Sequence, residues 1–199
     1  MEEGHGGETG GLLPAAEGYG PLLQRDYWAV VAACRLGPSE VMALVAEHFE
    51  RFAPAEIAAF HRDEGCALEL GDELHVRIAG AGLAHVRVVH RDAQSLTLAT
   101  LAGHPEAGRI TFGAYRNERG DVVFHIRSRA RSGSALKYLG WRGVGEAMQT
   151  NTWIDFVNRV AAAAGDGVVG HITAETQPID EEPEDAARSS PTFLARGEE

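Results

Sequence analysis

The chain has 199 residues, of which 44% are hydrophobic, and both values are typical of one globular domain with its own core. The formal net charge is -11, and the 18 basic residues are scattered along the chain. Nucleic acid is therefore not expected as a partner, because phosphate binding needs clustered lysine and arginine. No run of about 18 apolar residues is present, so we expect no membrane span. The N-terminus lacks the basic and then apolar layout of a signal peptide, which favours a cytoplasmic protein.

Composition divides the chain into three parts. Residues 1–24 are rich in glycine and show little periodicity, so we expect a flexible N-terminal tail. Residues 25–165 carry the periodic patterns of a folded domain. Proline, acidic residues and serine dominate residues 166–199, and we expect a disordered acidic tail there.

The first expected elements are one strand and two short helices. A run of apolar residues over Tyr27 to Arg35 predicts the strand, and Gly37-Pro38-Ser39 then opens a helix over about residues 40–52. Pro54 ends that helix and favours a second one over about residues 54–61, since proline is tolerated in the first turn.

The middle of the chain alternates between apolar and polar side chains, with a period of two. Residues 96–131 read as three consecutive strands, and shorter alternating runs precede them at 74–78 and 86–88. One face of these strands is apolar, whereas the other carries arginine. This pattern predicts a curved antiparallel sheet of about six to seven strands that is wetted on one side.

The apolar period changes to about 3.6 after Gly133, which predicts a long C-terminal helix. Gly140, Gly143 and Gly145 disfavour a helix there, so we place the firm helix from about Glu146 to Ala164. The expected fold class is α+β.

This order of elements resembles the helix-grip fold of the START-like superfamily, which includes the birch pollen allergen. A closer resemblance rests on Leu68 to Glu73, on Ala99 to Gly108 with its Gly-His-Pro-Glu-x-Gly turn, and on Val123 to Ser128. These segments are similar to an uncharacterised family from bacteria and plants, domain of unknown function nineteen-ninety. The resemblance implies a cavity between the sheet and the long helix, but no settled activity.

The turn supplies one candidate site, formed by His104, Glu106 and Arg109. A histidine beside a carboxylate can act as an acid or base near neutral pH. The alternative is a structural turn, in which Pro105 fixes φ, the glycines adopt positive φ and His104 bonds to the local backbone.

Two other groups of residues are candidate sites. Arg127, Arg129 and Arg131 share one strand face and could bind an anion, or could form a solvated face that pairs with nearby acids. The histidines show no metal-binding spacing, and no dinucleotide or phosphate-binding motif occurs. We therefore expect no metal and no cofactor.

The apolar residues of the expected sheet and helix form either a plain core or the wall of a ligand cavity. The leading hypothesis is that the protein binds a small apolar or amphipathic molecule between sheet and helix. The first alternative is a small-molecule enzyme, of the hydrolase, cyclase or isomerase type, with His104 as acid or base. The second is a protein-interaction module. The oligomeric state stays open. The expected ligand-binding residues are Phe112, Phe124, Met148, Trp153, Phe156 and Arg109.

Overall fold

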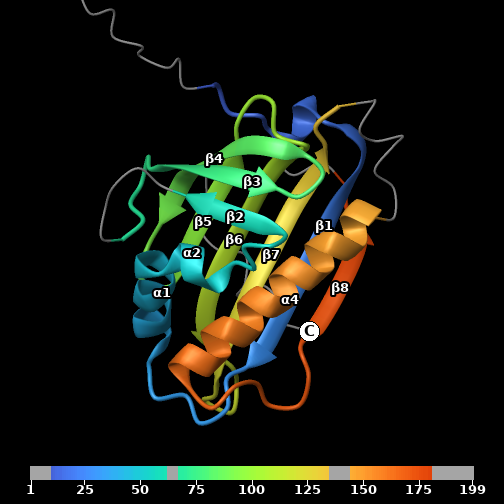
Figure 1. Cartoon of the computed structure of the whole chain (residues 1–199). Helices are drawn as coiled ribbons and strands as arrows, with labels where there is room; N and C mark the ends of the chain where they lie inside the picture. Colours follow the sequence, from blue (N-terminus) through green and yellow to red (C-terminus); the bar gives the residue numbers. More distant parts are fainter. Residues whose placement is uncertain (1–9, 62–66, 135–143, 181–199) are drawn as a thin grey trace, which may run out of the picture.

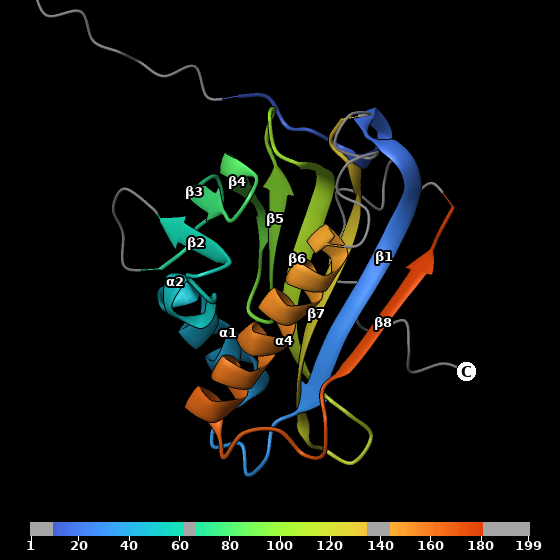
Figure 2. The same ribbon diagram turned by 45° about the vertical axis from the view of Figure 1, so that its right-hand side comes forward.

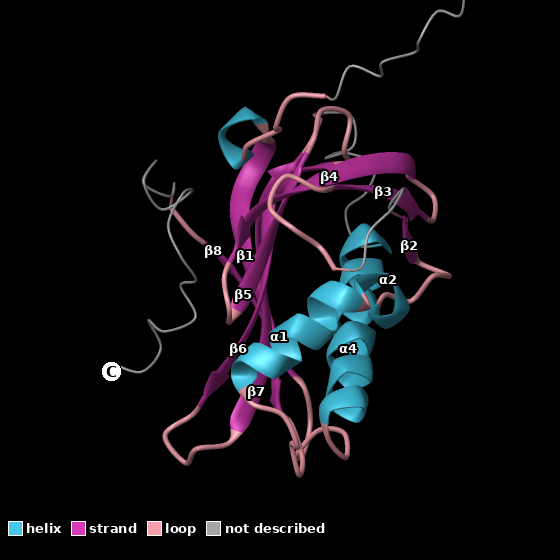
Figure 3. Ribbon diagram, turned by 90° about the vertical axis from the view of Figure 1, so that its left-hand side faces the viewer, coloured by secondary structure: helices cyan, strands magenta, loops and turns pink. Residues whose placement is uncertain are grey.

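The computed structural model describes residues 10–61, 67–134 and 144–180, with residues 144–149 described by their backbone alone. One antiparallel sheet of eight strands runs through this part of the chain, in the order β2-β3-β4-β5-β6-β7-β1-β8. The sheet curves around α4, the long helix that crosses it diagonally (Figure 1). Figure 3 shows α1, α2 and α4 together on the same side of the sheet.

The described elements follow one another along the chain. They are η1 (Ala15–Glu17), β1 (Tyr19–Val30), α1 (Pro38–Glu47), α2 (Phe49–Phe52), β2 (Ala58–His61), β3 (Glu73–Ile78), β4 (Gly82–Arg91), β5 (Ser95–Thr100), β6 (Glu106–Arg116), β7 (Val122–Ser132), α4 (Val144–Ala164) and β8 (Thr173–Pro178). The α+β class is confirmed.

The number of strands is larger than the six to seven expected, because two segments differ from the expectation. Residues 58–61 form β2 instead of the end of a helix, with Phe60 buried opposite Val76 of β3. Thr173–Pro178 forms β8 along the free edge of β1, although a disordered tail was expected from residue 166 (Figure 2). The long helix is therefore not the last element of the fold.

The two faces of the sheet have different neighbours. Tyr27 of β1, Phe112 of β6 and Phe124 of β7 point toward the helices and belong to the main core, and we call this the concave face. Side chains alternate along a strand, so Asp26, His125 and Tyr115 lie on the opposite, outer face. The arrangement confirms that the arginines of β7 point away from the apolar face.

The Gly-His-Pro-Glu-x-Gly turn joins β5 to β6, and its last glycine lies where the backbones of β6 and β7 come close together. Gly103 has φ of 88° and Gly108 has φ of 149°, both in the region that favours glycine. A Cβ at Gly108 would lie 2.2 Å from the backbone oxygen of Arg129 on β7. Any side chain at Gly108 would therefore push β6 away from β7.

Candidate functional site

Aromatic rings fill part of the space between the concave face of the sheet and α4. Phe156 of α4 is fully buried, and its ring centroid lies 5.1 Å from that of Phe112 and 6.2 Å from that of Phe124. Trp153, one turn earlier, lies 5.7 Å from Phe112, and Phe49 lies 5.0 Å from the same ring. Four of the expected ligand-binding residues therefore meet in one cluster, in which the rings contact one another.

The side chains of the concave face change from apolar to polar along the strands. Three successive rows of cross-strand partners describe it: Ala114–Phe124–Ala29, Phe112–Ile126–Tyr27 and Ile110–Ser128–Arg25. The first two rows are mostly apolar, whereas the third ends in a hydroxyl and a guanidinium group. The interior of the protein is thus amphipathic, with an aromatic end and a polar end.

The polar end contains an unusual arginine. The side chain of Arg25 is only 9% exposed, and its Nη1 lies 3.6 Å from Oε1 of Glu106. Within the part of the chain that the structure describes, Nε and Nη1 of Arg25 and Oγ of Ser128 are buried without a hydrogen-bond partner. A buried guanidinium cannot lose its proton, so it needs acceptors to offset the lost hydration. The described residues leave these donors unsatisfied.

His104 and Glu106 stay close to each other, but through the backbone of the turn. The Glu106 N–H donates to Nδ1 of His104 over 3.0 Å. This contact agrees with the structural interpretation of the turn, in which His104 bonds to the local backbone. The Glu106 side chain turns instead toward Arg25, a contact that the sequence pattern does not predict.

Two other expected ligand-binding residues do not add a described contact to the aromatic cluster. Arg109 of β6 is the cross-strand partner of Arg129 and lies on the outer face. Met148 lies in α4, within the segment described by its backbone alone.

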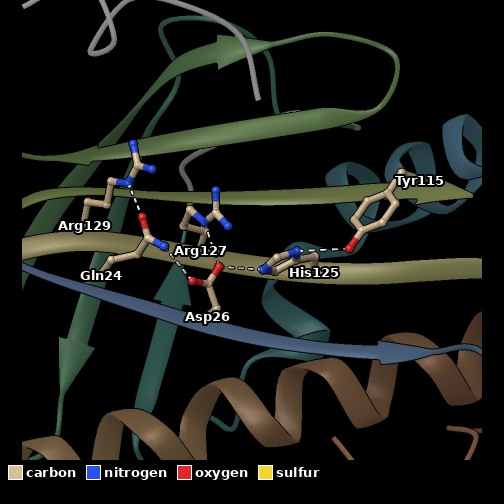
Figure 4. Close-up of polar contacts among 6 residues, drawn as sticks. All are labelled: Gln24, Asp26, Tyr115, His125, Arg127 and Arg129. Atoms are coloured by element: carbon tan, nitrogen blue, oxygen red, sulfur yellow. Dashed lines mark hydrogen bonds and ion pairs between the residues drawn. The ribbon is translucent and has the colours of Figure 1, made fainter. Parts of the chain in front are cut away.

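The outer face of β1 and β7 carries a buried polar network, shown in Figure 4. His125 Nε2 and Arg127 Nε each donate to Oδ1 of Asp26 over 2.7 Å, and Gln24 donates to Oδ2 over 2.8 Å. Arg129 in turn donates to Oε1 of Gln24 over 2.8 Å. The network joins side chains that are about 100 residues apart in the chain, and both oxygens of Asp26 are engaged.

Tyr115 of β6 extends this network to a third strand. Its hydroxyl lies 3.4 Å from Nδ1 of His125, whose Nε2 faces the carboxylate of Asp26. His125 is 1% exposed, so the imidazole is enclosed rather than open to a reactant. The arrangement is that of a structural link between strands.

The electrostatics of the network favour an ionised Asp26. Burial raises the pKa of this carboxyl, but the hydrogen bonds and positive charges of His125 and Arg127 outweigh burial and lower the pKa to about 2. Asp26 therefore stays charged across the physiological range and holds the side chains of His125 and Arg127 in place.

Three histidines lie next to one another on strands β2, β3 and β4. Their spacing in the sequence does not predict this proximity. His61 of β2 is the partner of His75 of β3, which is the partner of His85 of β4. The rings of His75 and His85 lie 4.8 Å apart. Among the described residues, however, no group of three or more histidine, cysteine or acidic side chains is placed to hold a metal ion.

An antiparallel sheet wrapped around one long helix defines the helix-grip class of fold. The sequence matches the family described as "Domain of unknown function (DUF1990)" over residues 24–169, so the chain belongs to that family. The resemblance carried by the Gly-His-Pro-Glu-x-Gly turn is thereby confirmed. A search of curated proteins gives no significant match to the chain.

Solved structures share the fold at low sequence identity. The KanY protein (ms6282) is 8% identical, has a TM-score of 0.54, and matches 73% of this chain and 99% of its own. The hypothetical protein jhp0584 from Helicobacter pylori is 11% identical, has a TM-score of 0.51, and matches 80% of this chain and 91% of its own. A more distant likeness is the ginseng major latex-like protein 151 from Panax ginseng, with 15% identity, a TM-score of 0.45, and matches over 73% of this chain and 99% of its own.

None of the described helices combines the length and the apolar character needed to cross a bilayer.

Proposed function

We propose that the protein binds a small amphipathic molecule between the concave face of the sheet and α4. The observation that supports this proposal best is the buried polar end of that face, where Arg25 and Ser128 hold donors without described partners. In a core that only stabilises the fold such groups are unfavourable, because each unsatisfied buried donor lowers the stability by about 1–3 kcal/mol, and by more when it is charged.

The aromatic end of the concave face suits the apolar part of such a molecule. Ligand sites are mostly apolar, with a few polar groups that fix orientation, and the three rows of the concave face have that composition. Trp153 is the member of the aromatic cluster that retains some exposure, at 9%, whereas Phe112, Phe124 and Phe156 have none. The indole ring is therefore the expected contact for an entering ligand.

The first test is native mass spectrometry of the purified full chain, compared with its mass after denaturation. A reproducible additional mass that is lost on denaturation would identify the ligand class. The second measurement is a fluorescence titration with N-phenyl-1-naphthylamine, a neutral apolar probe. We expect saturable binding with blue-shifted emission, because the probe leaves water for an apolar site.

A matched pair of tryptophan variants tests the location of the site. Trp153→Ala should weaken binding of the probe by about tenfold, since it removes an aromatic contact from the concave face. Trp28→Ala is the control, because Trp28 lies on the outer face, where its ring centroid is 5.5 Å from that of His125. Equal binding by the two variants, with both folded by circular dichroism, would contradict the proposed location.

A further inference from the structure

We propose that Arg25 and Ser128 bind the carboxylate group of an amphipathic ligand whose apolar part lies along the concave face toward Phe112 and Trp153. The inference rests on the proposed function and names the chemistry of its polar end. Arg25 and Ser128 are directly opposed partners on β1 and β7, so their side chains emerge side by side on the same face.

The unsatisfied donors match the acceptors of a carboxylate. This group offers two oxygens, so one oxygen can accept from the Arg25 guanidinium while the other accepts from the Ser128 hydroxyl. A neutral acceptor, such as an alcohol or an ester, supplies no charge to the guanidinium. Hydrogen bonds that involve a charged group are the stronger ones.

Glu106 limits the charge that the site accepts. Its carboxylate lies 3.6 Å from Nη1 of Arg25, which makes a long ion pair with no hydrogen bond. One added negative charge can share the arginine with Glu106, whereas a phosphate would bring about two and would be repelled more strongly. The neighbourhood of Glu106 thus favours a monoanion over a phosphate.

The rows of the concave face set the direction of the ligand. Arg25 stands four residues before Ala29 on β1, so the polar row and the aromatic end are about 13 Å apart at the rise of an extended strand. Ile126 and Tyr27 lie in the row between them. The site therefore suits a medium-length hydrocarbon chain or a fused ring system that ends in a carboxylate.

The test compares cis-parinaric acid with its methyl ester, which keeps the polyene chain and removes the charge. Both probes are titrated by fluorescence at pH 8 against the full chain. We expect the acid to bind about tenfold more tightly than the ester, the factor that corresponds to one charge-assisted hydrogen bond. Equal affinities for the acid and the ester would overturn the inference and leave the proposed function intact. Failure of both probes to bind would instead contradict the proposed function.

Substitutions of Arg25 and Ser128 test whether these two residues cause the tighter binding of the acid. Arg25→Gln should abolish it while ester binding is kept, and Ser128→Ala should reduce it severalfold. Arg129→Gln is the matched control, because this arginine donates to Gln24 on the outer face. A preference that persists in folded Arg25→Gln would overturn the assignment. If Arg25→Gln does not fold, the Ser128→Ala titration decides, since that change removes only a hydroxyl group, and an unchanged preference there contradicts the assignment.

Discussion

Arg25 and Asp26 are neighbours in the sequence, are both buried, and lie on opposite faces of the same strand. Asp26, on the outer face, accepts hydrogen bonds from His125, Arg127 and Gln24, so its charge is fully compensated. Arg25, on the concave face, has one carboxylate at 3.6 Å and two donors without a described hydrogen bond. Burial alone therefore does not indicate function. A buried charge whose hydrogen bonds are made within the fold can serve as a structural link, whereas an unsatisfied one indicates a place where another molecule is expected.

The largest expected effect concerns the aromatic end of the concave face. Phe156→Ala should lower the free energy of unfolding by about 3–5 kcal/mol, because it removes a fully buried ring and leaves a cavity among Phe112, Phe124 and Trp153. Urea denaturation followed by circular dichroism measures the change. Tyr19→Ala, at a side chain that is 51% exposed, is the control and should change stability by less than about 0.5 kcal/mol. A similar small loss for Phe156→Ala would mean that the rings are not closely packed.

The next effect tests whether the charge of Asp26 is compensated as described. The pKa of Asp26 is about 2 in the folded chain, against an unperturbed value of 3.8, so the folded state favours the ionised form. This contribution is present above pH 3.8 and is lost as the pH falls toward 2. It amounts to about 2 kcal/mol.

Comparison of the wild type with Asp26→Asn isolates this contribution from that of the other acidic groups. The difference in stability between the two proteins should be largest near neutral pH and should shrink by about 2 kcal/mol between pH 5 and pH 2. Urea denaturation at a series of pH values provides the measurement. A difference that stays constant with pH would show that Asp26 is not held in its charged form by His125 and Arg127.

The smallest effect sharpens the contrast between satisfied and unsatisfied hydroxyl groups. Ser95→Ala should lower stability by about 1 kcal/mol, because this buried hydroxyl bonds to Asp92 over 3.0 Å. Ser128→Ala should be neutral within about 0.5 kcal/mol, or stabilising, since its hydroxyl has no described partner. Thermal unfolding of both variants measures the two changes in stability. Equal losses of stability would mean that the Ser128 hydroxyl has a hydrogen-bond partner within the protein.

Local periodicity was sufficient to predict the elements that carry strong apolar patterns. The alternation in β6 and β7 placed Phe112 and Phe124 on one face and Arg127 on the other, and the structure confirms this. The apolar stripe of α4 predicted the long helix that ends at Ala164. Each of these patterns depends only on residues that are close in sequence.

Other elements depend on partners that the sequence does not reveal. The spacing of Ile57 and Phe60 fits one helical turn, but residues 58–61 form β2 and are held by their pairing with β3. The sequence of β8, Thr173–Pro178, has hardly any apolar pattern, because its backbone pairs with β1 while most of its side chains face solvent. Tertiary pairing outweighs local preference in both segments.

The candidate site was missed for the same reason. Arg25 and Asp26 precede Tyr27, where the first strand was expected to begin, and therefore appeared to lie at its border. Their pairing with Ser128 and Arg127 joins positions about 100 residues apart, and no local pattern predicts such a register. The observation that could have pointed to them is the presence of an acid and a base at the edge of an apolar run.

The pairing of β8 with β1 also affects how the molecule meets its own copies. Without β8, the 12-residue strand β1 would form the border of the sheet and would offer a long row of open backbone donors and acceptors to another chain. With β8 in place, the border is a short strand that carries Glu175 and ends at Pro178. A negative charge and a residue without an N–H both discourage strand addition. By covering the edge of β1, strand β8 thus reduces the tendency of the sheet to aggregate edge to edge.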